Sequence, residues 1–303
     1  MKKLLLSALA LCMALCVSCK KDNNNGGSVS PTITKVLKDI YGDYNYVVYS
    51  SEDQENWELV NEGEINNVLI QDYIYDGDKL ITMTYNSFSG TYGWTDSISY
   101  SEDGTVTQII EYFWELGYDP DRYKYDLVYD NGLITKVNCY YDGDYLDAYY
   151  DYYYTDNKLS KVVYTYVDYD KAPKNHRNKK FNHRDNTYSE EITWTGDNIT
   201  QIKRAGESWD YITTYEYDNK KNPYIENDAL VAYSYMSFDF AALSKNNVTI
   251  ISTNFGENAT YSYEYKDNYP SEEEVCYEYI YEYPDGTWNK INETYHYNLN
   301  YKQ

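Results

Sequence analysis

The sequence has few basic residues. Among 303 residues, 26 Lys and Arg stand against 49 Asp and Glu, so the formal net charge is −23. A protein that binds nucleic acid by neutralising phosphates needs a basic surface, and this composition argues against that class. After the first 19 residues, no apolar run approaches the ~18 residues of a membrane-spanning helix. We therefore expect no nucleic-acid partner and no spanning helix.

Motifs for catalysis and cofactor binding are also missing. The chain has no G-x-G-x-x-G, G-x-x-x-x-G-K-[ST] or G-x-S-x-G pattern, and its three histidines lack the H-E-x-x-H spacing of a zinc site. Carboxylates are so numerous that their abundance identifies no particular pair. We expect no catalytic residue, no metal and no cofactor, and so no enzyme. A hydrolase of envelope polysaccharides that uses paired carboxylates stays open as an alternative.

Aliphatic residues are scarce too. Leu, Ile, Val and Phe make up just under a fifth of the chain, which together with a high net charge is typical of disorder. The 43 Tyr and 6 Trp reverse this conclusion. Aromatic side chains bury large areas and pair well across β-strands. The sequence therefore predicts a folded protein rich in strands, whose apolar material is largely aromatic.

The first residues have the pattern of a bacterial secretory signal. Two lysines precede an apolar stretch at residues 4–17, and a Ser and a Cys follow it. The sequence LCVSC at residues 15–19 resembles a lipobox, although Cys16 stands where that pattern usually has Leu. This resemblance identifies Cys19 as the lipidated residue.

A lipid anchor holds a folded domain on a membrane without any spanning segment. We expect the protein in the cell envelope, at the outer membrane, attached through the anchor alone. Both the periplasmic and the surface face of that membrane stay open as its position. The predicted divisions are a lipoprotein signal peptide (residues 1–18), a flexible Gly/Asn/Ser-rich tether (19–30) and a single all-β repeat domain (31–303).

The rest of the chain repeats a unit of about 25 residues. In each copy an aromatic strand end is followed by an Asp/Asn/Gly turn and by a strand that opens with Leu, Ile or Val. Asp-Gly and Asn-Gly accept the positive φ that tight hairpin turns need. The turns occupy residues 75–78, 100–104, 129–132, 154–157 and 194–198, with more divergent copies ending at 217–219, 265–268 and 283–286.

This repeat predicts an all-β fold. One hairpin alone is marginally stable, so the copies must pair side by side as an antiparallel meander of roughly a dozen strands or more. The meander is expected to curl into a soluble barrel-like or strongly curved sheet. Leu80 and Met83 lie an odd number of residues apart, so they face opposite sides unless a β-bulge intervenes. One or two short helices are expected, over residues 31–41 and 238–244.

The units resemble the YD-type repeats of bacterial surface proteins. The segments YEYDNKKNPY (215–224), LSKNNV (243–248) and YSYEYKDNYP (261–270) also resemble a Bacteroidetes family of lipoproteins of unknown function, over roughly residues 65–300. This resemblance implies the porin-like all-β fold described for that family and a place in the cell envelope. It implies no catalytic residues.

Exposed aromatic side chains are the best indication of a binding site. Trp94 and Trp209 lie near Gly-containing loop segments outside the turn pattern, and flat rings stack on sugars or on apolar protein surfaces. We expect these two residues to form an aromatic platform. The alternative, that tyrosine simply fills a two-faced sheet, stays open. Separately, Asp96-Ser97-Ile98 fits a three-residue O-glycosylation pattern, which makes Ser97 a candidate.

Positive charge is concentrated in residues 171–184, which include no acid and lie in a 40-residue gap where the other gaps are 25–28. Either this loop folds back on its own acidic sheet, or it projects and binds an anionic partner such as a phosphorylated or uronic glycan. The candidate anion-binding residues are Lys174, Arg177, Lys179, Lys180 and Arg184.

Taken together, these patterns favour a non-enzymatic, lipid-anchored binding or scaffold protein of the cell envelope. Its partner would be an envelope glycan or another envelope protein. A purely structural repeat protein is a further alternative, beside the hydrolase. Cys139 and Cys276 either pair as a disulfide or lie as small buried strand residues.

Overall fold

The computed structural model describes residues 36–51, 55–142, 145–167, 187–206, 210–266, 268–282 and 287–302. Within these residues, sixteen antiparallel strands form one sheet that closes into a barrel, because β1 pairs with both β2 and β16. The predicted all-β meander is confirmed. The strands are β1 (Val36–Ser51), β2 (Glu58–Asp76), β3 (Lys79–Asn86), β4 (Tyr92–Tyr100), β5 (Val106–Glu115), β6 (Asp121–Asp130), β7 (Leu133–Tyr141), β8 (Tyr145–Thr155), β9 (Lys158–Tyr166), β10 (Thr187–Thr195), β11 (Asn198–Arg204), β12 (Tyr211–Lys221), β13 (Asn246–Thr253), β14 (Asn258–Lys266), β15 (Tyr269–Glu282) and β16 (Trp288–Lys302).

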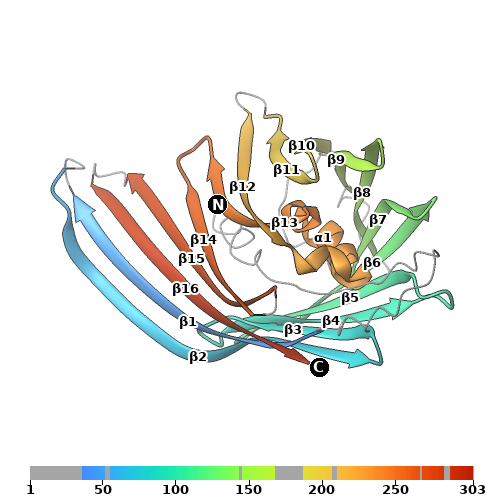
Figure 1. Cartoon of the computed structure of the whole chain (residues 1–303), viewed down its shortest axis with the longest axis horizontal. Coiled ribbons are helices and arrows are strands. Elements are labelled where there is room, and N and C mark those ends of the chain that lie inside the picture. The colour runs from blue at the N-terminus through green and yellow to red at the C-terminus, as the bar shows by residue number, and fades with distance from the viewer. Residues whose placement is uncertain are drawn as a thin grey trace, which may run out of the picture.

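A helical insertion lies inside the barrel. It joins β12 to β13 and consists of the 3-10 helix η3 (Pro223–Glu226), the helix α1 (Asp228–Ser237) and the 3-10 helix η4 (Phe240–Leu243). Figure 1 shows the sheet curving around α1, with the long strands β1, β2, β15 and β16 extending away from it. A barrel of sixteen strands is wide enough to leave an open lumen. Here the insertion fills part of that lumen.

The inner face of the sheet is aromatic. Tyr152 donates a hydrogen bond to the backbone carbonyl of Tyr235 on α1 (2.7 Å), and the rings of Tyr150 and Tyr164 lie 4.7 and 4.8 Å from that of Phe238. The large number of tyrosines thus serves mainly to fill the inside of the barrel. The residues that alternate with these tyrosines face outward and include Asp151, Lys161, Val163 and Thr165.

The two ends of the barrel differ. The tight turns after β2, β4, β6, β8 and β10 lie at one end, together with the first residue of β1, the last residue of β16 and the helical insertion. We call this end the turn end. The predicted Asn131-Gly132 turn has φ values of 50° and 80°, which is the geometry of a tight hairpin turn.

Bulges follow the turns, as the spacing of the apolar residues requires. Leu80 and Met83 are both buried, because the register between β2 and β3 shifts at Ile74 and Tyr75. The same shift occurs in the hairpins β4–β5, β6–β7, β8–β9 and β10–β11. The bulge that the sequence required is therefore present, and it recurs in each of these copies.

A second feature recurs at the turn end, where the pairing between successive hairpins stops early. The β7–β8 pairing, for example, ends at Lys136 and Asp151. Beyond this pair, the hydroxyl of Tyr154 donates a hydrogen bond to the backbone carbonyl of Ile134. In six of these pairings among the described residues, an aromatic side chain donates to a backbone carbonyl two residues beyond the last pair. The six donors and acceptors are Tyr100 and Leu80, Tyr154 and Ile134, Trp194 and Leu159, Tyr217 and Ile199, Tyr263 and Val248, and Tyr301 and Pro270.

Two of the sequence expectations about helices need correction. The described part of the segment 31–41, from Val36 onward, is strand β1, in which a bulge between Leu37 and Asp39 lets Leu37 and Ile40 both point inward. Apolar residues three positions apart are typical of one face of a helix, but a strand with a bulge between them produces the same spacing. In the segment 238–244 only the short η4 forms, and the longer helix α1 precedes it.

A third correction concerns the copy ending at 217–219, which was expected to turn back tightly. Strand β12 instead continues through these residues to Lys221, and the helical insertion follows.

Candidate functional site

An open groove of about 660 Å³ lies at the turn end. It is bounded by the β8–β9 and β10–β11 turns, the end of β12, helix α1 and the segment between η4 and β13. Its apolar wall comes from Leu159, Val231 and Leu243, and its polar groups from Lys158, Asp197 and neighbouring residues. Clefts of roughly 300–1,000 Å³ are the size that binds small molecules, so this groove is large enough for a ligand.

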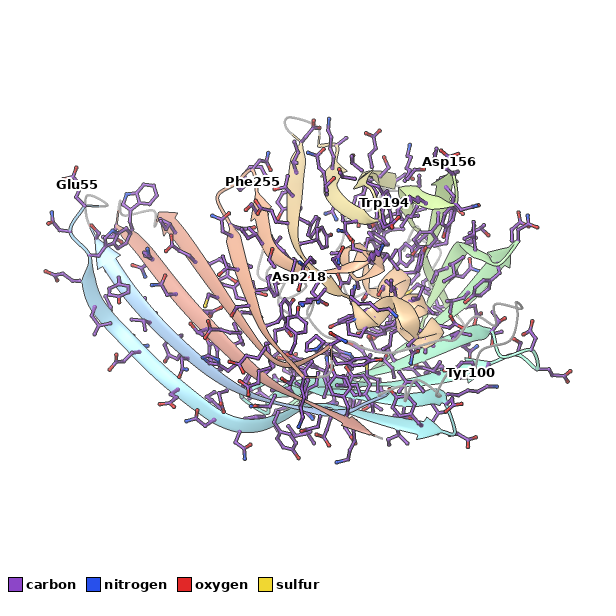
Figure 2. The ribbon with its side chains drawn as sticks, in the orientation of Figure 1. Glu55, Tyr100, Asp156, Trp194, Asp218 and Phe255 are labelled. Atoms are coloured by element: carbon purple, nitrogen blue, oxygen red, sulfur yellow. The ribbon has the colours of Figure 1, made fainter. Side chains whose placement is uncertain are left out.

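Trp194 provides the flat surface of this groove. It is the residue before the last of strand β10, at the position near the strand end where β2, β4, β6 and β8 have a tyrosine, and Figure 2 shows it next to α1. Its Nε1 donates to the carbonyl of Leu159 at 2.7 Å, and the Nζ of Lys158 lies 5.4 Å from its ring centre. The ring is half-buried. It is therefore held in one orientation while part of it faces the groove.

Two lysines of the groove share one carboxylate. The Nζ atoms of Lys158 and Lys245 lie 3.3 and 3.4 Å from the two oxygens of Asp197. Hydrogen bonds from Lys158 and then from Lys245 hold the pKa of Asp197 below its usual value. The Asp197 side chain is 60% exposed, so this ion pair lies at the rim and not in the protein interior.

Hydrogen bonds fasten the β10–β11 turn to the insertion. The amide of Asn198 donates to the side chain of Asn246 (3.0 Å) and accepts from its backbone N–H (3.1 Å). The backbone N–H of Ile199 donates to Ser244 Oγ at 2.9 Å, and that of Lys245 to the carbonyl of Asp197 at 3.1 Å. The groove is therefore built on connected elements, which favours a preformed site.

Two carboxyl groups lie in a second, smaller cavity inside the barrel. Asp239, before η4, and Glu273, on β15, both line a cavity of about 70 Å³ together with Tyr215, Tyr261 and Tyr263. Burial raises the pKa of Asp239 to about 7 and that of Glu273 to about 8. A cavity of this size holds a few water molecules, each of which needs ~10–15 Å³ by the same measure, and not a sugar ring.

A second pair of acids faces inward from β4 and β5. Asp96 and Glu111 are directly opposite each other across the two strands. Burial, and then the charge of Glu111, raises the pKa of Asp96, and burial raises that of Glu111 to about 7. Asp96 is fully buried, and its two oxygens have no hydrogen-bond partner among the described residues. A polysaccharide therefore cannot contact Asp96, and the cavity of Asp239 and Glu273 is too small for a sugar ring.

Trp94 does not form a surface platform. It is 8% exposed, and its ring stacks on that of Tyr85 with centres 4.0 Å apart. It lies on the inner face of β4, because it alternates with Thr95 and Ser97 and shares its face with buried Asp96 and Ile98. The neighbouring glycine had suggested that Trp94 lies in a loop. Strand β4 instead begins at Tyr92, and its alternation directs the Trp94 side chain into the barrel.

The other predicted site residues are placed as follows. Ser97 is half-buried on the outer face of β4, between Thr82 and Ile110 on the neighbouring strands. Cys139 and Cys276 are not bonded to each other. The residues outside the described part are Cys19, Lys174, Arg177, Lys179, Lys180, Arg184 and Trp209.

Reasoning from the sequence missed the groove, although one signal pointed to it. Trp194 replaces the tyrosine that ends the corresponding strand of the other copies, and a change of residue type at a repeated position marks a local role. Lys245 lies 51 residues after Trp194 in the sequence. Only the folded chain brings it to Asp197, so no local pattern could have linked the two.

Comparisons with known proteins give a limited result. No protein-family model and no curated protein matches the chain. Solved structures similar to it include the following two. Both are described as porin-like proteins, one from Bacteroides uniformis (10% identity, TM-score 0.39, covering 86% of this chain and 96% of that chain) and one from Bacteroides vulgatus (14% identity, TM-score 0.30, covering 84% and 97%). Membership of the lipoprotein family stays a prediction.

Proposed function

We propose that the protein is a non-enzymatic, lipid-anchored binding protein of the cell envelope, and that it takes a glycan into the groove at the turn end. The single observation that carries this proposal is the groove itself. It has the volume of a ligand site and presents a fixed, half-buried Trp194 ring beside amide and charged side chains. A flat apolar face with polar groups around it suits the apolar face and the hydroxyl edge of a sugar.

The outer wall of the barrel supports attachment by an anchor and not by insertion of the barrel into lipid. Glu272, Glu274 and Glu278 face outward from β15, alternating with the buried Glu273 and Val275. Charged side chains on a lipid-facing wall are destabilising in the middle of a bilayer. Among the described residues, no helix is long and apolar enough to cross a membrane. An acyl chain on Cys19 would then hold the barrel at the membrane surface.

The direction of the chain supports an arrangement in which the groove lies on the side of the proposed anchor. Strand β1 begins at the turn end, which is also the end that carries the groove. The predicted tether is therefore attached on the groove side, and the groove would face the membrane to which the protein is fixed. A ligand displayed on that membrane surface fits this arrangement.

A purely structural repeat protein is less well supported. Repeats that build a larger shell can join through unpaired sheet edges. In the described barrel, β1 pairs with both β2 and β16, so closure removes the edge that such an assembly would use.

Binding of the mature chain to a glycan array, followed by calorimetric titration of the glycans that bind, tests the proposal. We expect Trp194→Ala to weaken binding at least tenfold and Trp194→Phe, which keeps a ring, to weaken it less. Tyr153→Ala, which removes a ring that is 52% exposed on the outer face of β8, is the matched control. If no glycan binds to the folded protein, or if Trp194→Ala binds normally, the proposal is wrong.

A further inference from the structure

The charge of the groove has the opposite sign to that of the chain. The protein carries a net charge of −23, yet the charged side chains that line the groove are Lys158, Lys221 and Lys245 against a single acid, Asp197. A local excess of positive charge in an acidic protein attracts anions to that position and repels them elsewhere. The lining of the groove therefore has the charge that favours an anionic ligand.

Asp197 occupies the place where an anionic ligand group would bind. Each of its oxygens lies within 3.4 Å of one ammonium group, and the side chain is largely exposed in a tight turn after Gly196. Two ammonium groups around one carboxylate leave a net positive charge after pairing. Exposed ion pairs of this kind contribute little to stability, so a ligand can replace Asp197 at small cost.

The Trp194 ring lies beside one lysine of this pair, Lys158. The Nζ of Lys158 is 5.4 Å from the ring centre and 3.3 Å from Asp197. A sugar ring stacked on Trp194 would therefore bring a substituent within reach of both lysines. The stacking surface and the anion position are close enough to act on one sugar residue.

We propose that the groove selects acidic saccharides, in which a carboxylate or sulfate takes the position of Asp197 between Lys158 and Lys245 while the sugar ring stacks on Trp194. This inference rests on the proposed function and names its ligand class. Asp197 is then an internal competitor, which the ligand displaces from the two lysines.

The test compares ligands that differ in charge. The mature chain is titrated with oligogalacturonate and with its methyl ester, and in a second arm with dextran sulfate oligosaccharides and with dextran. We expect the acidic member of at least one pair to bind at least tenfold more tightly than its neutral partner, with an affinity that falls as NaCl is added. The two arms distinguish a carboxylate ligand from a sulfate ligand.

Variants locate the effect. Lys158→Ser combined with Lys245→Ser should reduce the affinity for the acidic ligand to that of the neutral one, whereas Asp197→Asn should raise the affinity for the acidic ligand several-fold. Lys161→Ser, on the outer face of β9, is the control for loss of a lysine away from the groove, and melting curves verify that each variant folds.

Equal affinity for acidic and neutral ligands, with binding still dependent on Trp194, overturns this inference and leaves the proposed function standing. The same holds if the double lysine variant keeps its preference for acid. If the folded protein binds no saccharide, both proposals fail.

Discussion

The hydroxyl of Tyr154 donates a hydrogen bond to the backbone carbonyl of Ile134 at 2.6 Å. The two residues lie on adjacent strands, β8 and β7, beyond the last pair of their ladder. Five further aromatic donors make the same contact elsewhere in the barrel. This contact explains why the repeat has an aromatic residue near the turn. The side chain donates a hydrogen bond to a backbone carbonyl that has no partner in the strand pairing.

We predict that Tyr154→Phe destabilises the protein by about 1 kcal/mol, and by up to ~3 kcal/mol if the carbonyl of Ile134 is left without a partner. The ring and its packing stay, so the loss reports the hydroxyl alone. Urea unfolding measures it. Tyr153→Phe, on the exposed outer face of the same strand, should change stability by less than ~0.5 kcal/mol. Equal stability of the two variants would show that the hydroxyl of Tyr154 has no such role.

Gly132→Val should be among the most damaging substitutions in a turn. Gly132 has a φ of 80°, and its missing Cβ would meet no neighbouring atom, so the cost comes from the backbone conformation and not from a clash. A β-branched residue resists this conformation, and the loss should be at least ~1 kcal/mol. Thermal unfolding measures the change. Asn131→Gly, at a neighbouring φ of 50°, is the control and should not destabilise the turn.

Much of the wall of the barrel could be predicted because its determinants are local. Turn residues such as Asn131 and Gly132 fix the hairpins, and the odd spacing of Leu80 and Met83 required the bulge that the structure shows. The same spacing argument failed at Leu37 and Ile40, where a bulged strand and a helix place apolar residues alike. Local sequence does not decide between the two, since the choice depends on pairing with β2 and β16.

The candidate site could not be predicted in the same way, because distant segments build it. The two lysines on Asp197 come from the turn after β8 and from the segment before β13. Likewise, the inward direction of Trp94 depends on where β4 begins. The sequence also predicted that exposed aromatic side chains bind a ligand. Binding of a glycan to the groove, and its loss in Trp194→Ala, tests that prediction.

Cys19→Ser should release the protein from the membrane fraction into the soluble fraction. The signal sequence would still direct export, but the residue expected to carry the acyl chains would be missing. Fractionation and metabolic acyl labelling measure the two effects. Cys12→Ser, in the apolar stretch before the lipobox-like residues 15–19, is the control and should leave both unchanged. Normal labelling and normal membrane association of Cys19→Ser would contradict the anchor.

The protein should lose stability as the pH rises from about 5 to about 8. Burial raises the pKa of Glu273 to about 8 and that of Asp239 to about 7. In the unfolded chain these groups lose their protons near pH ~4, whereas the folded chain keeps them to higher pH. The folded state therefore binds more protons between these values, and each group lowers the free energy of unfolding by at most ~1.4 kcal/mol per pH unit in that window.

Thermal unfolding at several pH values, with and without Glu273→Gln, separates this effect from general repulsion in an acidic protein. Glu273→Gln keeps the shape of the side chain and removes its ionisation. The melting temperature of this variant should therefore fall less steeply than that of the unmodified protein between about pH 5 and about pH 8, the range set by the raised pKa values. Glu264→Gln removes a carboxyl group from the exposed face of β14 and should leave the slope as it is. If the two variants have parallel pH profiles, ionisation of Glu273 does not lower the stability of the folded protein. Its cavity would then admit more water than a volume of about 70 Å³ allows.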